Sequence, residues 1–211
     1  GTKSIHTFGQ DDHNKGKLLT KEVKDSAGNL FTKEITTWSD THPFTDVHFV
    51  FVSQQDNYIY DGDASYKQTR QTFTYDSYGN VNSVVVNYND GYTKTTANTY
   101  DNDITNWILG KLTYSKVTAT APEQASQYRE SSFSYDQTTG RLLTEVIEPY
   151  RSAFTLTTTY GYDGFGNRTS KKVEGPDITT RTEYYDYNDG RGQFMTSRRN
   201  ALGHTEYFAN T

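Results

Sequence analysis

Side chains that could catalyse a reaction or bind a metal are spread thinly along this sequence. The chain has five histidines, His6, His13, His42, His48 and His204. No His-x-x-x-His pair is present, which is the spacing that brings two imidazoles to one zinc ion on a helix. His48 lies in an apolar run and is therefore interpreted as a core or edge residue of a strand. Serine and threonine abound, but no Gly-x-Ser-x-Gly elbow accompanies them. The sequence predicts no catalytic residue, no metal site, no cofactor and no enzymatic activity.

Two groups of carboxylates and amides have spacings similar to those of a calcium-binding loop. They are Asp101-Asn102-Asp103, and Asp186 with Asn188 and Asp189. Neither group has the glycine at position six and the closing glutamate that a twelve-residue calcium loop requires. We interpret both groups as turn formers. Asp103 is expected to cap a single helical turn that Trp107 anchors.

The strongest pattern is a repeated Tyr-Asp motif. The stretch 73–81 (FTYDSYGNV) recurs at 133–141 (FSYDQTTGR) and at 160–168 (YGYDGFGNR), with shorter echoes at Tyr100-Asp101 and Tyr185-Asp186. Successive Tyr-Asp pairs follow one another after 25, 35, 27 and 23 residues. Self-similarity at a period of about 20–50 residues is the signature of a repeat architecture.

Each unit predicts a strand, a tight turn and a second strand. The aspartate can accept a hydrogen bond from a backbone N–H two residues later, and the glycine can take the positive φ that closes the turn. The tyrosine is expected to stack on the same tyrosine of the next hairpin. The predicted structural turn residues are Tyr75, Asp76, Gly79, Asn80, Tyr135, Asp136, Gly140, Arg141, Tyr162, Asp163, Gly166 and Asn167.

Composition limits what these hairpins can build. Leu, Ile, Val and Phe make up 38 of 211 residues, while 18 tyrosines supply much of the remaining apolar area. Such a chain predicts sheets that meet water on one face or on both. It has no cysteine, no apolar run long enough to span a membrane, and a net charge of −5. We therefore expect neither disulfides, nor a membrane span, nor binding to nucleic acid.

Along the chain, residues 1–17 are predicted to form a poorly ordered start, and residues 18–211 a β-sheet of repeats. The first residue resembles a cleavage product, so we expect a piece of a longer protein. Residues 18–38 read as a hairpin with its turn at 25–29. Residues 39–46 are predicted to be a connection, and residues 47–52 a buried strand.

The three full motifs resemble the YD repeats of the Rhs family, which also occur in bacterial toxin-complex proteins and in teneurins. The resemblance implies an all-β fold of antiparallel hairpins in a curved open sheet, forming a segment of a hollow spiral shell. In several members that shell encloses a C-terminal toxic domain. Such members release it through an Asp-Pro-x-Gly-Leu segment, and this sequence contains no Asp-Pro. The resemblance also implies a parent protein that is secreted or on the bacterial cell surface.

Three functions are compatible with the sequence. The first is a non-enzymatic shell segment, whose partners are the remainder of the parent shell and its enclosed domain. The second is a module that binds carbohydrate at a cell surface, since exposed tyrosine and tryptophan rings can stack on sugars. The third, an enzyme, has the least support. Strands left unpaired at the sheet edges are expected to self-associate.

Overall fold

The computed structural model describes residues 1–62, 65–188 and 190–209, and within these ranges the side chains of residues 43 and 44 are not described. The described part is all-β and contains no helix. In particular, none of its elements is a helix long and apolar enough to cross a membrane. The all-β fold that the resemblance implied is thus confirmed.

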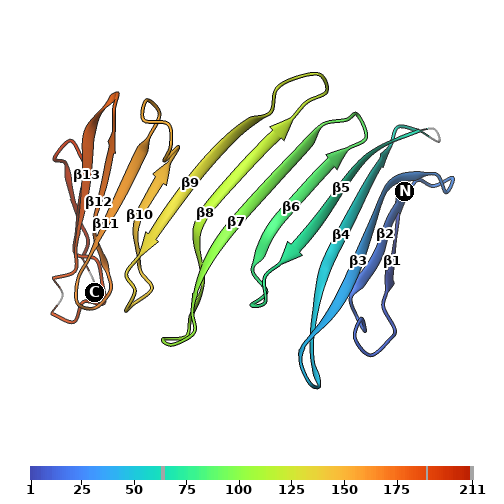
Figure 1. The fold of residues 1–211 in the computed structure, drawn as a ribbon, viewed down its shortest axis with the longest axis horizontal. Coiled ribbons are helices and arrows are strands. Elements are labelled where there is room, and N and C mark those ends of the chain that lie inside the picture. Colours follow the sequence, from blue (N-terminus) through green and yellow to red (C-terminus); the bar gives the residue numbers. More distant parts are fainter. Residues whose placement is uncertain (63–64, 189, 210–211) are drawn as a thin grey trace. The chain divides into compact units, whose positions relative to one another are not determined.

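Fifteen strands form a single open antiparallel sheet in which each strand is hydrogen-bonded to the next one along the sequence. Figure 1 labels most of them in chain order. The strands are β1 (Lys3–Phe8), β2 (Leu18–Lys24), β3 (Leu30–Phe44), β4 (Val47–Tyr60), β5 (Tyr66–Tyr75), β6 (Val81–Tyr88), β7 (Thr93–Asp103), β8 (Ile108–Thr120), β9 (Gln127–Tyr135), β10 (Leu142–Ile147), β11 (Leu156–Tyr162), β12 (Arg168–Gly175), β13 (Ile178–Asp186), β14 (Ser197–Arg199) and β15 (Thr205–Tyr207).

The chain divides into two compact units. The first comprises Gly1–Asn98 with Lys116–Tyr128, and the second comprises Thr99–Ser115 with Arg129–Thr211. Strands β1 to β6 therefore lie in the first unit and β10 to β15 in the second, while β7, β8 and β9 contribute to both. The features described below each lie within one unit.

Local turn chemistry accounts for most of the strand boundaries. The predicted turn at 25–29 separates β2 from β3, and a loop at 121–126 separates β8 from β9. At Asn89-Asp90-Gly91 the chain closes a hairpin, because the Tyr88 amide donates to the Tyr92 carbonyl at 2.9 Å. Residues 175–177 likewise turn the chain from β12 into β13.

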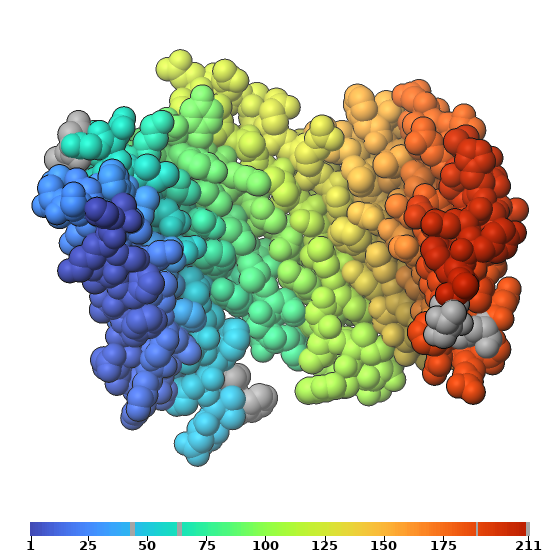
Figure 2. Space-filling view, turned by 180° about the vertical axis from the view of Figure 1, so that it is seen from behind, coloured from blue at the N-terminus to red at the C-terminus, as the bar shows by residue number. Residues whose placement is uncertain are grey.

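Three expectations for the first sixty residues differ from the structure. Residues 1–17, predicted to be poorly ordered, contain β1, which pairs with β2 from Lys3↔Lys24 to Phe8↔Leu18. Residues 39–46 are not a connection, because β3 continues to Phe44 and only residues 45 and 46 turn. The hairpin of β3 and β4 therefore extends beyond the β1–β2 and β5–β6 hairpins (Figures 1 and 2).

The predicted buried strand at 47–52 is the third difference. It forms the start of β4, but Val47 is 48% exposed and the other residues of the run are at best half-buried. A strand is fully buried only when both of its faces are covered, and the described residues provide no second layer over this hairpin. The apolar run at 47–52 thus predicted the strand correctly and its burial incorrectly.

The sheet has almost no apolar core. Tyr185 is the one buried apolar residue among those described, whereas seven buried residues are polar or charged. Asp56 on β4 is the clearest example, since it is 4% exposed and accepts hydrogen bonds from Gln54, Gln68 and Arg70 at 2.6–2.9 Å. This pattern confirms the prediction, made from the scarcity of aliphatic residues, that much of the sheet meets water.

Candidate functional site: the Tyr-Asp turns

The turn after Tyr75 shows what the aspartate of the repeat does. The Asp76 amide donates to the Asn80 carbonyl at 2.9 Å, and the Gly79 amide donates to the Asp76 carbonyl at 3.2 Å. The Asp76 carboxylate lies inside this ring, where Oδ1 accepts from the amides of Tyr78 and Asn80 and Oδ2 accepts from the Asn80 side chain, all at 2.9 Å. One carboxylate thus satisfies three donors that the turn would otherwise leave to water.

The same arrangement recurs at the other full repeats. Asp163 Oδ1 accepts hydrogen bonds from three backbone amides at 2.8–2.9 Å. Its Oδ2 accepts one from the side-chain nitrogen of Asn167 at 3.0 Å. Asp136 closes a turn that is one residue longer, and its Oδ1 accepts from the amides of Thr138 and Thr139 and from the Thr139 hydroxyl. The role predicted for the aspartate, which is to form the turn, corresponds to this geometry.

Two further turns use this chemistry without the preceding tyrosine. Asp25 accepts from the amides of Ala27 and Asn29 at 2.8 Å and from the Asn29 side chain at 2.9 Å. Asn200 does the same through its amide oxygen, which accepts from the amides of Leu202 and His204 at 3.0 Å. An amide oxygen can therefore replace the carboxylate oxygen that holds the backbone.

The glycine of each full repeat combines a positive φ with close packing. Gly79 has φ +84° and Gly140 has φ +71°, in the left-handed region that side chains disfavour. A Cβ atom at Gly79 would lie 3.1 Å from the Phe49 ring, and one at Gly140 would approach Ile108 even more closely. Phe49 belongs to β4 and Ile108 to β8, so each glycine packs against the preceding hairpin.

The tyrosine of the repeat makes a contact that the sequence did not predict. Its phenol hydroxyl donates to a backbone carbonyl about twenty residues earlier in the chain. Tyr75 donates to Val52 at 2.9 Å, Tyr135 to Leu112 at 2.9 Å, and Tyr162 to Leu142 at 2.8 Å. The ring contacts of Tyr75 are with Phe49 and Phe51, rather than with another repeat tyrosine as expected. We call this hydrogen bond the tyrosine clamp.

The clamp forms where main-chain pairing between the two strands has ended. The ladder between β4 and β5 stops at Gln54↔Thr72, three residues before Tyr75. Likewise, the ladder between β10 and β11 stops at Thr144↔Thr159, three residues before Tyr162. A carbonyl beyond the end of the ladder has no amide partner on that side. The phenol hydroxyl supplies the missing donor across the wider gap.

In two of the repeats, the residue that follows the glycine contacts the next turn or loop. Asn167 donates to the Gly192 carbonyl at 2.7 Å in addition to its bond with Asp163. Arg141 extends from its own turn to the next one, where Nη1 donates to the Asp163 carbonyl at 3.5 Å and the guanidinium lies 5.8 Å from the centre of the Tyr162 ring. These two repeats therefore contact the preceding hairpin through their tyrosine. They contact the following hairpin through Arg141 or Asn167.

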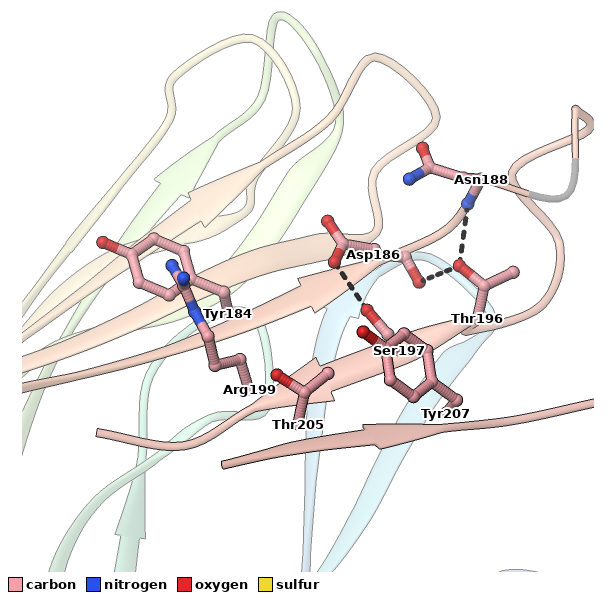
Figure 3. Close-up of a pocket in the computed structure, with 8 residues that line it drawn as sticks. All are labelled: Tyr184, Asp186, Asn188, Thr196, Ser197, Arg199, Thr205 and Tyr207. Atoms are coloured by element: carbon pink, nitrogen blue, oxygen red, sulfur yellow. Dashed lines mark hydrogen bonds between the residues drawn. The ribbon is translucent and has the colours of Figure 1, made fainter. Parts of the chain in front are cut away.

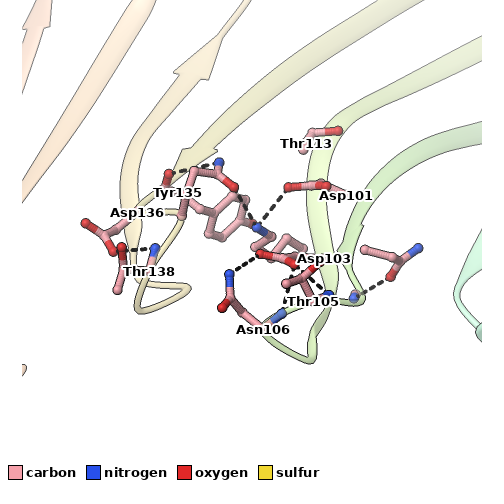
Figure 4. Close-up of polar contacts among 12 residues, drawn as sticks. Asp101, Asp103, Thr105, Asn106, Thr113, Tyr135, Asp136 and Thr138 are labelled. Carbon is pink, nitrogen blue, oxygen red and sulfur yellow. Dashed lines mark hydrogen bonds and ion pairs between the residues drawn. The ribbon is translucent and has the colours of Figure 1, made fainter.

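The two shorter echoes do not form this turn. Tyr100 and Asp101 lie within β7, and the residue that turns the chain is Asp103, whose carboxylate accepts from Thr105 and Asn106 at 2.8–3.0 Å (Figure 4). This is a turn and not a helical turn, and Trp107 does not anchor it, because it is 75% exposed at φ +56°.

The carboxylates of both calcium-like groups point to separate partners. Asp101 pairs with Lys111 Nζ at 2.8 Å, and the Asn102 oxygen accepts from the Gly110 amide at 2.8 Å. Asp186 accepts a hydrogen bond from the Ser197 hydroxyl at 2.6 Å, while Asp189 lies outside the described residues. The interpretation of Asp103 as a turn former is confirmed, and Asp101 instead belongs to a strand.

Two groupings of polar residues were not found from the sequence. His13, His42 and His48, interpreted above as scattered, lie together around Asp40. Glu148, which follows β10, is 2% exposed, and its carboxylate lies 3.6 Å from guanidinium nitrogens of Arg129 and Arg151. Both groupings depend on strand register and loop conformation, so no local sequence pattern reveals them.

A polar pocket of about 500 Å³ lies on β13 to β15. Figure 3 shows the Arg199 guanidinium beside the Tyr184 ring, at 4.6 Å, and Tyr207 on the neighbouring strand. The Ser197 hydroxyl donates to Asp186, and the Thr196 hydroxyl oxygen accepts from the Asn188 amide. The pocket thus combines two aromatic rings with several hydrogen-bonding groups.

The geometry defines an all-β protein made of consecutive hairpin repeats. No family model and no curated protein matches the chain. One similar solved structure is TcdB2-TccC3, with 17% identity and a TM-score of 0.49 over 95% of this chain and 11% of that chain. Another is TcdB2-TccC3-Cdc42, with 16% identity and a TM-score of 0.39 over 94% of this chain and 12% of that chain. A porin-like protein from Bacteroides uniformis ATCC 8492 also matches, with 14% identity and a TM-score of 0.36. That match covers 98% of this chain and 92% of the porin-like chain.

The chain spans only about a tenth of the TcdB2-TccC3 chains that it matches. At identities below 20% and TM-scores below 0.5, these similarities carry no argument about what this chain does. The function proposed below is therefore argued from the repeat and its contacts.

The tyrosine clamp predicts a loss of stability when its hydroxyl is removed. Tyr75→Phe keeps the ring and leaves the Val52 carbonyl without its donor, so unfolding should require about 1 kcal/mol less free energy. Urea denaturation followed by fluorescence measures this difference. Tyr78→Phe is the matched control, because Tyr78 is 46% exposed and its hydroxyl makes no hydrogen bond within the described residues. Equal midpoints for the two variants would contradict the clamp.

The glycine packing predicts a graded response to alanine. Gly28 has φ +93° with open space around its Cα, whereas Gly79 has a similar φ and contacts Phe49. Gly28→Ala should therefore cost about 1 kcal/mol from the backbone alone. Gly79→Ala should cost more, because Phe49 must also move, and Gly79→Val should cost the most. Thermal melts test this order, and a Gly79→Ala variant as stable as Gly28→Ala would contradict the packing.

The turn carboxylates predict a loss of stability in acid. Hydrogen bonds from Thr139 lower the pKa of Asp136, and those from Asn29 and from Asn106 lower the pKa values of Asp25 and Asp103 below the usual 3.8. Because the folded pKa lies below the unfolded one, this stabilisation is present above about pH 4 and is lost as the pH falls through the folded values. Urea midpoints at pH 6 to 2.5 should decline in that range. The difference between wild type and Asp136→Asn should shrink in parallel, and a constant difference would refute the link.

Proposed function

We propose that this chain is a non-enzymatic structural segment of an Rhs/YD-repeat shell, which in the parent protein encloses a C-terminal toxin or effector domain. One observation supports the proposal most directly. All three full repeats direct the tyrosine clamp at the backbone of the preceding hairpin. A repeated motif that attaches each hairpin to its neighbour is suited to building a wall, in which each unit is stabilised by the adjoining units.

The arrangement of the other groups favours the same function. The Asp76 carboxylate accepts hydrogen bonds from donors of its own turn, which is what a structural turn residue does. The partners that follow from this proposal are the adjoining hairpins of the parent shell and the domain inside it. In the described residues β1 pairs on one side only, with β2, so we also propose that its outer edge pairs with another strand, in the parent or in a second copy.

The proposal is tested on the parent protein with limited proteolysis. A shell that encloses its C-terminal domain should protect that domain, so the domain should be cleaved much more slowly within the parent than when expressed alone. The double variant Tyr135→Phe with Tyr162→Phe should loosen the wall and raise the cleavage rate, while Tyr78→Phe should leave it unchanged. Equal cleavage of the enclosed and isolated domains would overturn the proposed encapsulation.

A second candidate function is carbohydrate binding at a cell surface by a secreted or surface-attached parent. The pocket on β13 to β15 supports it, because Tyr184 and Tyr207 could stack on a sugar ring while Asp186 and Arg199 bind its hydroxyl groups. A glycan array with wild type and Tyr207→Ala distinguishes the two candidates. Binding that is lost in Tyr207→Ala would favour this function, whereas an array without any bound glycan would reject it.

A further inference from the structure

The first unit contains a cluster of histidines around one carboxylate. His13 comes from the loop between β1 and β2, Asp40 and His42 from the end of β3, and His48 from the start of β4. His48 Nδ1 lies 2.5 Å from Asp40 Oδ2, and His42 Nε2 lies 3.4 Å from the same oxygen. His13, Asp40 and His48 each offer one ligand atom, and these three atoms all lie within 4.8 Å of one another.

Sheet geometry explains why residues so far apart in sequence meet. Asp40 is paired directly with Val50, and side chains two residues apart on a strand share a face. His42 and His48 therefore lie on the same face as Asp40. The register shift between Thr41 and Phe44 alters the alignment of the two strands at this point.

The loop that carries His13 is held by its own aspartate. Asp11 Oδ1 accepts from the amides of His13 and Asn14 at 3.1 and 2.8 Å. The His13 ring stacks on His48 with centroids 3.9 Å apart, and the His42 ring meets His48 edge-on at 4.1 Å. Three imidazoles are therefore gathered on one carboxylate from two separate hairpins.

The electrostatics of this cluster are unbalanced as it stands. If the three imidazoles were protonated, three positive charges would share one carboxylate. If they are neutral, each ring carries a nitrogen lone pair that can bind a cation. The second oxygen of Asp40, Oδ1, is buried and has no hydrogen-bond partner. The ion pairs of Asp40 in the described residues are with His42 and His48 alone. A divalent cation would satisfy both the lone pairs and the carboxylate.

We propose that His13, Asp40 and His48 form a binding site for a divalent transition-metal ion of the Zn²⁺ class, with a solvent molecule as the fourth ligand. Imidazole nitrogen with one carboxylate oxygen is a donor set that zinc accepts in a tetrahedral arrangement, whereas Mg²⁺ and Ca²⁺ prefer oxygen alone. Bonds of about 2.0–2.1 Å place neighbouring ligand atoms of a tetrahedral site roughly 3.4 Å apart. His48 Nδ1 and Asp40 Oδ2, now 2.5 Å apart, are closer together than this value.

The ion takes the place of the hydrogen between His48 Nδ1 and Asp40 Oδ2. In a neutral imidazole that hydrogen moves to Nε2 of the same ring, and in an imidazolium it is released to solvent. The two atoms then move apart by about 1 Å to the tetrahedral spacing. The ion then links the β1–β2 loop to the β3–β4 hairpin. It should stabilise the first unit, because a ligand that binds only the folded state raises its stability.

The test titrates Zn²⁺ into the tag-free chain by isothermal calorimetry, with Co²⁺ absorption as an independent report of the ligands. One ion should bind per chain, a millimolar excess of Mg²⁺ should not displace it, and Co²⁺ should give the strong visible bands of a tetrahedral site. His13→Ala and His48→Ala should each lower the affinity for Zn²⁺ at least tenfold. Losing a group that only supports a metal ligand already costs about tenfold, and losing a ligand should cost no less. His204→Ala is the matched control and should bind as wild type does.

The variants also keep the test decisive if folding is affected. His13 is exposed, and its one ring contact is with His48, so His13→Ala should fold normally by circular dichroism. Asp40→Asn keeps the shape of the side chain, and it should lose the metal-dependent rise in melting temperature that wild type shows. A wild-type chain that binds no Zn²⁺ at tenfold excess would overturn the proposal. Unchanged affinity in the double variant His13→Ala with His48→Ala would overturn it equally.

Discussion

The hydrogen bond from a repeat tyrosine to the backbone of the preceding hairpin is the interaction on which this sheet most depends. In most domains, neighbouring elements are held together by a shared apolar core. Here one described apolar residue is buried, so most of the cohesion between hairpins must come from ladder hydrogen bonds and from side chains that extend them. Tyr75 and Tyr162 each add such a bond where a ladder has ended, and Tyr135 makes the same bond to Leu112.

The aspartate makes this placement possible. By holding up to three backbone amides, as Asp163 does, it fixes the conformation of the turn and therefore the direction in which the adjacent tyrosine leaves the strand. The glycine lets the preceding hairpin approach, as Phe49 approaches Gly79. The repeat is thus a single device with a local part, which closes the turn, and a non-local part, which attaches it to the neighbour.

This division explains what could be predicted from the sequence. The turn at Asp76 and most strand limits depend on residues within four positions of one another, and they were predicted. The acceptor of Tyr75 was not, because it depends on where the β4–β5 ladder ends. The histidine cluster was missed for the same reason, since Asp40 and His48 meet only once β3 is seen to continue past residue 39. Trp107 was misjudged because an aromatic ring in a turn can simply remain exposed.

The clamp has a consequence for how such a chain could evolve. Its acceptor is a peptide carbonyl, which every amino acid provides, so the tyrosine places no demand on which side chains the neighbouring hairpin carries. Val52, Leu112 and Leu142 are accepted through their backbones alone. Hairpins joined in this way can be duplicated, exchanged or allowed to diverge without a compensating substitution in the neighbouring hairpin. The length of such a wall can therefore vary while its joints stay the same.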